Sequence, residues 1–394
     1  MEYSSDFIID HSNDTANMKI CKSIHIHTDY KFIHNTNLFE GESFTNDILI
    51  IQNNQPYKGK LSENITLINE KDCDIINIVK ICRSYNFVVL YDLDSIKCRI
   101  ANALPKDVII FWRFFGYELY SRKRFDYLGT DTLKQINKNY NIFQHFYNNH
   151  IIPILSYPIR QKRSFYKAVK RINYILGLFE EEYIHLTKKW ELPSFIQIPL
   201  FQVKHTIELS DFKEKEHSPS IIAIGNSRST YNNHIEIIKL IEQSKNKENY
   251  NFTLLFNYGP ENCYTYQIRR IVENKKYFSL VEAFIPPEEF KYFYSKYSAL
   301  VINGYRQMAM GNIFLAIQSG VKIYLNKKNV VYHWFLNNDF SVFPIDSLTE
   351  DIENNNVMLD KSTALHNLEQ LKKIAKNYTK EHFQKYVLSI LEKK

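Results

Sequence analysis

The sequence predicts an α/β protein of two doubly wound, Rossmann-like lobes with a cleft between them. Two observations support this fold class. Short apolar runs alternate along the chain with segments of helical periodicity, which is the pattern of parallel strands joined by crossover helices. The chain has 394 residues. At about 100–200 residues per domain, this length suits two domains, each able to bury its own core.

The pattern is clearest in the second half of the chain. We expect strands at residues 220–224, 252–256, 278–284, 299–302 and 321–325. We expect helices at residues 234–244, 264–272 and 311–318, the last closed by Gly320. A further helix should open at Pro286, because proline and the acids that follow it favour a first helical turn.

The first half repeats the pattern less regularly. Strands are expected at residues 23–27, 47–51, 87–91, 108–112 and 196–201, and helices at 73–83 and 131–148. The polar segment 205–219 is the expected linker. The predicted division is therefore a first lobe of residues 1–206, a second lobe of residues 207–363, and a helical segment of residues 364–394 that can pack back on the first lobe.

Composition narrows the function classes. The formal net charge is +7, a mildly basic balance that does not indicate nucleic-acid binding, and no nucleic-acid partner is predicted. The five cysteines form no Cys-x-x-Cys pair, which favours a reducing compartment such as the cytoplasm over a zinc site. No apolar window reaches the roughly 18 residues of a membrane span, and the polar start does not resemble a secretory signal. An aromatic content of 15% suits sugar stacking and contact with a membrane interface.

A polar turn follows the first expected strand of the second lobe. Its candidate ligand-binding residues are Gly225, Asn226, Ser227, Arg228, Asn233 and His234. Such a turn exposes backbone N–H groups at a helix start, where an anion is stabilised, and Arg228 adds a positive charge. An ordinary strand-to-helix loop with asparagine caps is the simpler alternative. Tyr258 follows the next strand and is assigned to the same site.

A second loop follows the expected strand at 299–302 and opens the helix at 311–318. Its candidate residues are Arg306, Gln307, Gly311 and Asn312. An arginine can bond two phosphate oxygens at once, and a helix N-terminus adds N–H groups, so the loop suits a diphosphate. The alternative is that Arg306 is a solvated loop charge. Because ligands of such sheets bind beyond the carboxyl ends of strands, the two loops together predict a nucleotide diphosphate site.

An Asp-x-Asp motif follows the expected strand at 87–91. Asp92 and Asp94 can hold a divalent ion on phosphates, as in transferases of a different, single-lobed fold. Motifs of this length are common by chance, so a strand-end turn with a helix cap at Asp94 is the favoured interpretation.

A histidine pair ends the expected strand at 23–27. Alternation along a strand places His25 and His27 on one face. No convincing third ligand accompanies them, so no metal is predicted, and either histidine can belong to a solvated loop. Asp29, just beyond the pair, is a candidate general base for an acceptor hydroxyl.

Aromatic and basic residues gather after the expected strand at 108–112. Trp112 and Glu118 lie in an aromatic segment that suits stacking on a sugar, with Glu118 as the second candidate base; core packing is the alternative. Further on, basic residues are interleaved with aromatic ones: Arg160, Lys162, Arg163 and Lys167. This combination predicts contact with an acceptor at an anionic membrane surface, and a solvated basic face is the alternative.

These motifs together resemble one known family, the enterobacterial TDP-4-acetamido-4,6-dideoxygalactose:lipid II transferases, which add the third sugar of enterobacterial common antigen. Gly225-Asn226-Ser227 and Asn233-His234-Ile235 are similar to that family's glycine-asparagine-serine and asparagine-histidine-isoleucine stretch. Arg306-Gln307 with Gly311 resembles its arginine-glutamine-glutamine-glycine-isoleucine-glycine loop. The resemblance covers most of residues 107–345, and Glu118 stands where the family has aspartate.

The resemblance implies the two-lobed transferase fold called GT-B, with no metal or other cofactor required. It implies that a deoxyamino-hexose donor, linked to TDP or another nucleotide, lies on the second lobe between the two loops. The acceptor would be an undecaprenyl-diphosphate-linked or other glycan on the first lobe, with the protein peripheral on the cytoplasmic face of the inner membrane. Two alternatives stay open: a polyol-phosphate transferase of similar shape, and a non-catalytic glycan- or lipid-binding protein of polysaccharide assembly.

Overall fold

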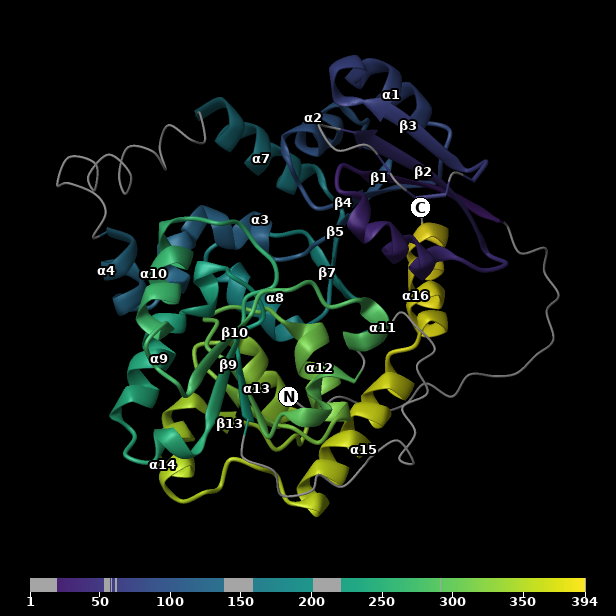
Figure 1. Ribbon diagram of the computed structural model, residues 1–394. Helices are drawn as coiled ribbons and strands as arrows, with labels where there is room; N and C mark the ends of the chain where they lie inside the picture. Colours follow the sequence, from purple (N-terminus) through teal and green to yellow (C-terminus); the bar gives the residue numbers. More distant parts are fainter. Residues whose placement is uncertain are drawn as a thin grey trace.

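The chain folds around two wholly parallel sheets (Figure 1). The computed structural model describes residues 20–52, 57, 59–60, 62–137, 159–200, 221–290 and 292–393. The seven-stranded first sheet has the order β3-β2-β1-β4-β5-β6-β7. Its strands are β1 Cys21–His27, β2 Phe44–Gln52, β3 Ile65–Asn69, β4 Phe87–Tyr91, β5 Ile109–Arg113, β6 Tyr174–Gly177 and β7 Ser194–Gln197.

The six-stranded second sheet has the order β10-β9-β8-β11-β12-β13. Its strands are β8 Ile221–Ile224, β9 Asn251–Leu255, β10 Phe278–Val281, β11 Ala299–Ile302, β12 Lys322–Leu325 and β13 Phe343–Pro344. The central strands of both sheets are buried along their whole length, because helices cover both faces of each sheet.

Helices of the first lobe separate its strands along the chain. They are α1 Ile75–Cys82, α2 Ser95–Ala103, α3 Tyr117–Tyr120, α4 Thr130–Asn137, α7 Ile159–Arg171 and α8 Glu180–Thr187, with 3-10 segments η1 Tyr30–Phe39, η2 Glu70–Asp72 and η3 Ser121–Tyr127. Asp74 and Asp94 cap α1 and α2 by accepting hydrogen bonds from backbone N–H groups of the first turn, which satisfies donors that a helix start leaves unpaired.

The second lobe is built in the same way. Its helices are α9 His234–Gln243, α10 Cys263–Val272, α11 Pro287–Phe290, α12 Met310–Gln318, α13 Val330–Asn337 and α14 Leu348–Glu353, with 3-10 segments η6 Thr230–Asn232, η7 Lys247–Asn249, η8 Phe293–Lys296 and η9 Ile345–Ser347. The core on one face of the sheet includes residues of α9, α10 and α14, and that on the other includes residues of α12 and α13. This is the doubly wound arrangement that the sequence predicts.

Strand alternation divides the first-lobe core into two layers. Val88 and Leu90 of β4 pack with residues of α1, α2 and α7 on one face of the sheet. Phe87, Val89 and Tyr91 pack with residues of η1 and of the C-terminal helix on the other. Each layer is thus built from alternate residues of the same strands.

The C-terminal segment consists of two helices, where the sequence indicates one helical region. Helix α15 (Lys361–Asn377) packs on α12 of the second lobe, and α16 (Lys380–Glu392) returns to the first lobe, as Figure 1 shows in yellow. Phe383 of α16 contacts Phe39 edge to face at 5.3 Å, and Gln384 donates to the Leu38 carbonyl at 2.9 Å. The two helices are separate because a new helix begins after Thr379, whose side chain caps the N-terminus of α16.

The two lobes also meet through α4, which packs against α9. The Gly129 N–H donates to Asn233 Oδ1 at 2.7 Å, and the Thr132 hydroxyl donates to Glu236 Oε2 at 2.6 Å. An ion pair between Lys239 and Asp131 adds to this contact. The lobe junction is therefore held by directed polar bonds.

The parallel α/β prediction is confirmed for both lobes, and all ten expected strands have a counterpart among those described above. Sequence reasoning missed strands β3, β6 and β13 and helices α2, α3, α7, α8, α13 and α14. The expected linker at 205–219 and the end of the helix expected at 131–148 lie outside the described residues. The division at residue 206 therefore stays a prediction.

Candidate active site

Two loops of the second lobe lie where the strand order of its sheet reverses. The chain moves outward from β8 to β9 and β10, then returns to β11 beside β8 and continues to β12 and β13 on the other side. Ligands of doubly wound sheets bind at this switch point, because the loops leaving the two strands diverge there. The loop after β8 contains Gly225–Asn233, and the loop after β11 contains Asn303–Ala309. Both predicted phosphate loops thus lie at the switch point.

The loop after β8 is a compact polar turn. Gly225 has a φ of +70°, which favours glycine, and its N–H donates to the Val301 carbonyl of β11 at 2.8 Å. The Asn232 amide donates to the carbonyl of Ser227 at 3.0 Å and to its hydroxyl at 3.2 Å. Asn226 donates to the hydroxyl of Tyr258, so the loops after β8 and β9 are joined. This bonding fixes the turn before any ligand arrives.

The loop after β11 places Arg306 at the lobe junction. Its guanidinium lies 4.6 Å from the ring centroid of Tyr231 and 5.2 Å from that of Tyr120 in the first lobe. Nη1 donates to the Gln307 carbonyl at 3.0 Å, whereas the buried Nε has no hydrogen-bond partner among the described residues. Arg306 makes no ion pair with any described carboxylate. Its charge is therefore available to an anion.

Helix α12 begins directly after this loop. Ala309 precedes it with a φ of +61°, and Gly311 in its first turn is exposed, with open space where a Cβ would lie. Asn312 instead turns inward and donates to the Tyr294 hydroxyl at 2.8 Å. The first turn of α12 is thus accessible at Gly311, where backbone N–H groups can face an anion.

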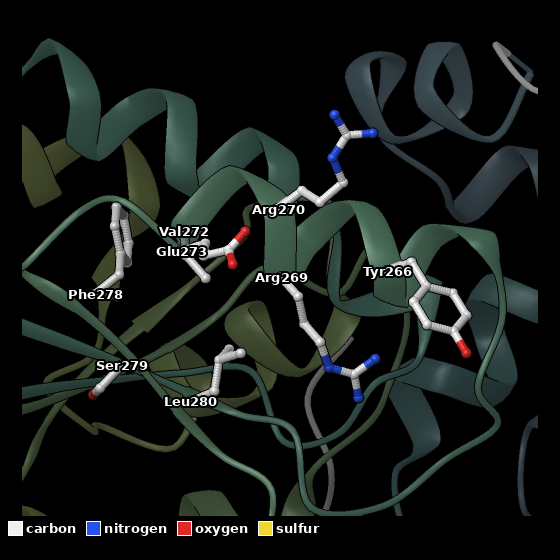
Figure 2. A pocket seen from close by; sticks show the side chains of 8 residues that line it. All are labelled: Tyr266, Arg269, Arg270, Val272, Glu273, Phe278, Ser279 and Leu280. Carbon is white, nitrogen blue, oxygen red and sulfur yellow. The ribbon is translucent and has the colours of Figure 1, made fainter.

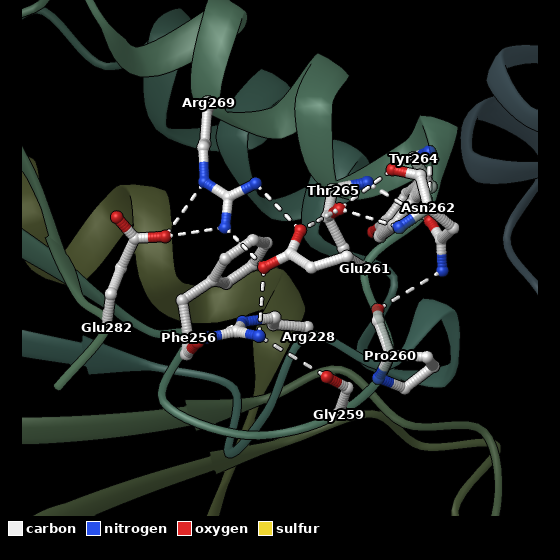
Figure 3. Close-up of polar contacts among 10 residues, drawn as sticks. All are labelled: Arg228, Phe256, Gly259, Pro260, Glu261, Asn262, Tyr264, Thr265, Arg269 and Glu282. Carbon is white, nitrogen blue, oxygen red and sulfur yellow. Dashed lines mark hydrogen bonds and ion pairs between the residues drawn. The ribbon is translucent and has the colours of Figure 1, made fainter. Parts of the chain in front are cut away.

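Arg228 differs from Arg306 because a carboxylate already neutralises it (Figure 3). Its Nη1 lies 2.9 Å from Glu261 Oε1, and Glu261 also bonds Arg269 through both oxygens. These bonds to Arg269, with help from Arg228, lower the pKa of Glu261 to about 2. Arg269 in turn pairs with Glu282 at 2.6 Å. The assignment of Arg228 to donor binding stays a prediction. It requires the Arg228 guanidinium to bind a donor phosphate while it is also paired with Glu261.

Asn233 and His234, both assigned to the donor from the sequence, are fully buried. Asn233 accepts from Gly129 and donates to the Asn303 carbonyl at 3.0 Å, so it ties the junction together. The ring of His234 bonds the Tyr264 hydroxyl at 3.1 Å, and burial lowers its pKa to about 3. A Cβ on Gly225 would lie 2.9 Å from His234 Nε2. These two buried side chains therefore help to hold the loop after β8 in place.

The switch point of the first sheet lies between β1 and β4. The fully buried Lys97 pairs there with Asp92 and Asp94, both at 2.7 Å. Thr28, which follows β1, donates to Asp94 at 2.6 Å. The Asp-x-Asp motif therefore forms an internal ion cluster and a helix cap, as favoured from the sequence. Among the described residues, no group of three or more histidine, cysteine or acidic side chains is arranged to hold a metal ion.

His25 and His27 lie within β1 and are both fully buried, which corrects the expectation of a solvated loop. Both contact the ring of Tyr91, so they do share one face. Asp29 follows at the strand end and is partly exposed. A strand end reads as a loop in the sequence, and only the packing of η1 against β1 shows that these histidines are covered.

Glu118 belongs to a buried acidic cluster beside the junction. Its Oε1 accepts from Trp112 Nε1 at 3.3 Å and from the Phe115 N–H at 3.2 Å, while Oε2 has no partner among the described residues. Burial, reinforced by the charge of Asp92, raises the pKa of Glu118 to about 8. In this state Glu118 is a proton donor at neutral pH.

Glu182 on α8 is a further member that sequence reasoning missed. It accepts from the Tyr120 hydroxyl at 2.7 Å, and burial raises its pKa to about 7 against the opposing charges of Arg306 and Arg113. The run of acids at residues 180–182 is visible in the sequence. It was not linked to a strand end because β6, which precedes α8, was not recognised.

Comparison with known proteins shows what this architecture is similar to. No protein-family model matches the sequence, and no curated protein is significantly similar to it. Solved structures do match. Sucrose-phosphate synthase from Thermosynechococcus elongatus has a TM-score of 0.62 at 10% identity, over 94% of this chain and 98% of that one. WaaG, a glycosyltransferase involved in lipopolysaccharide biosynthesis, has a TM-score of 0.55 at 10% identity, over 94% and 99%. The α-glucosyltransferase AGT in complex with UDP has a TM-score of 0.52 at 9% identity, over 94% and 100%.

The fold is of the GT-B type. In this GT-B chain, Arg306 of the loop after β11 contacts the ring of Tyr120 on α3, which follows β5 of the first lobe. The loop after β11 therefore lies at the junction of the two lobes.

The expected acceptor and membrane residues of this GT-B chain separate into two groups. Trp112 is fully buried and packs edge to face on Phe114 and Phe165, which corrects the expectation that it stacks on a sugar and agrees with the alternative of core packing. Lys162 is partly exposed, and Arg163 and Lys167 are exposed on α7. The side chain of Arg160 lies outside the described residues.

Other basic residues of this region are structural. Arg122 stacks on Phe165 at 3.6 Å and donates to the Glu118 carbonyl. Arg171 donates to the carbonyls of Leu104 and Val108 at the end of α2. The exposed face of α7 consequently keeps fewer free charges than the sequence indicates. No helix among the described residues is long and apolar enough to cross a membrane.

A hollow of the second lobe lies at the edge of its sheet. It has a volume of about 410 Å³ and is formed by α10 and the edge strand β10 (Figure 2). Its lining residues are Tyr266, Arg269, Arg270, Val272, Glu273, Phe278, Ser279 and Leu280. Its residue Arg269 shares Glu261 with Arg228 of the loop after β8, but β10 is the outer strand, two strands from β8. We therefore assign the candidate site to the switch point.

Proposed function

We propose that the chain is a glycosyltransferase that moves a sugar from a nucleotide diphosphate donor to a hydroxyl of a glycan acceptor. The observation that carries this proposal is Arg306, a cation without a described carboxylate partner, beside an exposed helix start at the switch point of a GT-B sheet. UDP is bound by the structurally similar AGT. A diphosphate between the Gly225 loop and the first turn of α12 would meet backbone N–H groups and the guanidinium together.

The proposed chemistry follows from this placement. The acceptor oxygen attacks the anomeric carbon of the sugar, the bond from that carbon to the diphosphate breaks, and the nucleoside diphosphate leaves with the bonding electrons. Arg306 and the N–H groups of α12 stabilise the charge that develops on the leaving group. Asp29, which is partly exposed beside β1, is the proposed base for the acceptor proton. Glu118, protonated in this state, is better suited to donate a hydrogen bond to the sugar.

The identities of the donor and the acceptor are proposed from the family resemblance and from the exposed side chains of α7. A deoxyamino-hexose linked to TDP is the proposed donor, since the loop motifs resemble those of transferases using such a sugar. A lipid-linked glycan is the proposed acceptor. The exposed Arg163, Tyr166 and Lys167 of α7 support docking to an anionic membrane surface. The proposed place of action is the cytoplasmic face of the inner membrane.

A donor screen tests the proposal. Thermal shifts with UDP, TDP, GDP and CMP identify the nucleotide, and the matching nucleotide sugars are then assayed for turnover. Release of a nucleoside diphosphate supports sugar transfer, whereas release of a monophosphate identifies a polyol-phosphate transferase. Nucleotide binding without turnover of any donor would favour the non-catalytic alternative. Absence of binding by all four nucleotides would refute the proposed site.

A further inference from the structure

Arg306 is held between aromatic rings of both lobes. Its guanidinium lies 4.6 Å from the ring centroid of Tyr231 and 5.2 Å from that of Tyr120. Tyr120 is buried on α3 of the first lobe. An aromatic ring attracts a cation through its electron-rich face, but it carries no net charge that could neutralise the cation. Tyr120 therefore helps to position Arg306 and leaves its positive charge in place.

The hydroxyl of Tyr120 connects this ring to a buried carboxyl group. It donates to Glu182 Oε1 at 2.7 Å, and only 4% of Glu182 is exposed. Gly116 leaves room for the pair, because a Cβ at this position would lie 3.0 Å from the Tyr120 ring and 3.6 Å from Glu182 Oε1. Its φ of +95° also favours glycine. Arg306, Tyr120 and Glu182 thus form one connected cluster across the lobe junction.

Helix α8 places Glu182 at this junction. It follows β6 of the first lobe and packs on α13 of the second, so that it lies between α3 and α13 (Figure 1). Phe179, which precedes α8, contacts Trp334 of α13 with 4.7 Å between the ring centroids. Glu182 is therefore held by packing against both lobes, and its carboxyl group belongs to their interface.

The ionisation of Glu182 depends on the groups that face it. Burial raises the pKa of Glu182 to about 7. The hydrogen bond from Tyr120 and the charges of Arg306 and Arg113 oppose this rise, because each stabilises the carboxylate. Of these groups, Arg306 is the one whose charge the proposed donor would neutralise. Other ionisable side chains on the elements around Glu182 include Tyr117 and Glu118 of α3, Tyr127 of η3, Tyr332 and His333 of α13, and Glu180, Glu181, Tyr183 and His185 of α8.

We propose that Glu182 and Tyr120 are a positioning pair that couples donor binding to a proton: an ionised Glu182 competes for the charge of Arg306, and a protonated Glu182 leaves that charge to a diphosphate. The donor is that of the proposed function, on which this inference rests. A diphosphate beside Arg306 adds negative charge to the cluster, so the complex favours the protonated carboxyl group and binding takes up a proton from solvent. By linkage, donor affinity is highest where Glu182 is already protonated and falls as pH rises through the pKa of the free protein.

The first experiment tests the coupling without a ligand. Melting temperatures are measured at pH 5 and pH 9 for the wild type, Glu182→Gln, Arg306→Ala and the double variant. At pH 9 Arg306 partly compensates the ionised carboxylate, so Glu182→Gln should raise the melting temperature by at least about 2 °C more in the Arg306→Ala background than in the wild type. At pH 5 the carboxyl group is protonated, and the two backgrounds should respond equally. Glu180→Gln, exposed on the same helix, is the matched control and should respond equally at both pH values.

The second experiment measures donor affinity against pH. The probes are UDP-glucose, UDP-N-acetylglucosamine, TDP-glucose and GDP-mannose, whose diphosphates are esterified at both ends and do not titrate near neutral pH. Between pH 6 and pH 8.5 the wild type should lose at least about threefold in affinity relative to Glu182→Gln. Calorimetry in two buffers of different protonation enthalpy should show proton uptake by the wild type that Glu182→Gln lacks. Glu118 titrates in a similar range but is present in both proteins, so its contribution cancels.

Tyr120→Phe tests the second member of the pair. It keeps the ring beside Arg306 but removes the hydroxyl that stabilises the carboxylate of Glu182. The fall of donor affinity should therefore move to higher pH, by about one pH unit. This variant also carries the test if Glu182→Gln does not fold.

Two outcomes would overturn the proposal. One is an equal response of the two backgrounds to Glu182→Gln at pH 9, which would show that Glu182 does not sense the charge of Arg306. The other is a donor affinity whose pH dependence is the same in the wild type, Glu182→Gln and Tyr120→Phe. If the wild type binds none of the probes, the proposed function fails separately, and the melting temperatures still decide whether Glu182 and Arg306 are coupled.

Discussion

The two lobes share a sheet architecture but differ in the side chains at their switch points. The second lobe offers a glycine turn, amide side chains and Arg306, whose charge faces the junction. In the first lobe the cation at the switch point, Lys97, is buried against two carboxylates, Asp92 and Asp94, so its positive charge is already engaged. The proposed diphosphate site therefore lies on the second lobe, where the charge of Arg306 is not paired with a described carboxylate, whereas the cation of the first lobe is. Two sheets of the same design thus differ in the charge that their switch points offer to a ligand.

The largest effect is expected from breaking the internal charge balance of the first lobe. Lys97→Met leaves the buried Asp92 and the partly exposed Asp94 without their cation, and an uncompensated buried charge costs about 3–5 kcal/mol. The expected result is a large loss in the free energy of unfolding at neutral pH. Chemical denaturation measures it, with the exposed pair Lys170 and Glu191 as a control, where Lys170→Met should cost at most about 1 kcal/mol. Equal effects of the two changes would show that the buried cluster is not a structural unit.

The next effect concerns the anion-binding edge. Removing a charged phosphate contact from such a site costs about 2–4 kcal/mol of transition-state stabilisation. Arg306→Ala should therefore lower turnover about 100-fold or more and weaken nucleotide diphosphate binding, with the melting temperature little changed. Arg270→Ala, exposed on α10, is the matched control and should be active. Activity of Arg306→Ala within threefold of the wild type would contradict the donor placement.

A third prediction uses the buried acid between the two edges. Because burial raises the pKa of Glu118 to about 8, folding favours its protonated form. The stabilisation is complete below about pH 4.5, the usual value for glutamate, and is lost as pH rises through about 8. Glu118→Gln stays neutral at every pH. Its free energy of unfolding should therefore equal that of the wild type at pH 5 and exceed it by roughly 2 kcal/mol at pH 9. The exposed Glu180→Gln serves as control, and a pH-independent difference for Glu118→Gln would exclude this titration.

The smallest expected effect is at the outer face of the first lobe. Each basic residue near an anionic surface contributes about 1 kcal/mol, and salt screens this within roughly 10 Å. Arg163→Glu with Lys167→Glu should therefore weaken co-sedimentation with anionic liposomes, and added salt should do the same to the wild type. Lys373→Glu with Lys376→Glu, both exposed on α15, is the matched control. Equal binding of the wild type to neutral and anionic liposomes would mean that this face is merely solvated.

The sequence predicts the second lobe better than the first for a physical reason. Strands such as β11 and β12 are short apolar runs bounded by loops. They are easy to recognise in the sequence because burial on both faces makes every residue of the run apolar or nearly so. In the first lobe, β6 is only four residues long and follows α7 almost directly, so no separate apolar run marks it as a strand. Missing β6 hid the place of Glu182.

Side-chain placement was less predictable than strand position. The sequence locates both phosphate loops, because their position follows from strand ends. It does not show that Glu261 pairs with Arg228, or that Trp112 is buried, since these depend on contacts between distant segments. The buried state of His27 likewise depends on how η1 packs against β1, which no local pattern encodes.

The return of the C-terminal segment to the first lobe has a mechanical consequence. At Tyr378–Thr379 the chain passes from α15, which packs on the second lobe, to α16, which packs on the first. This short crossing is a covalent tether, so any motion that separates α15 from α16 must bend the backbone there. The freedom of Arg306 to move away from Tyr120 is consequently limited by a link that is distant in sequence from both residues.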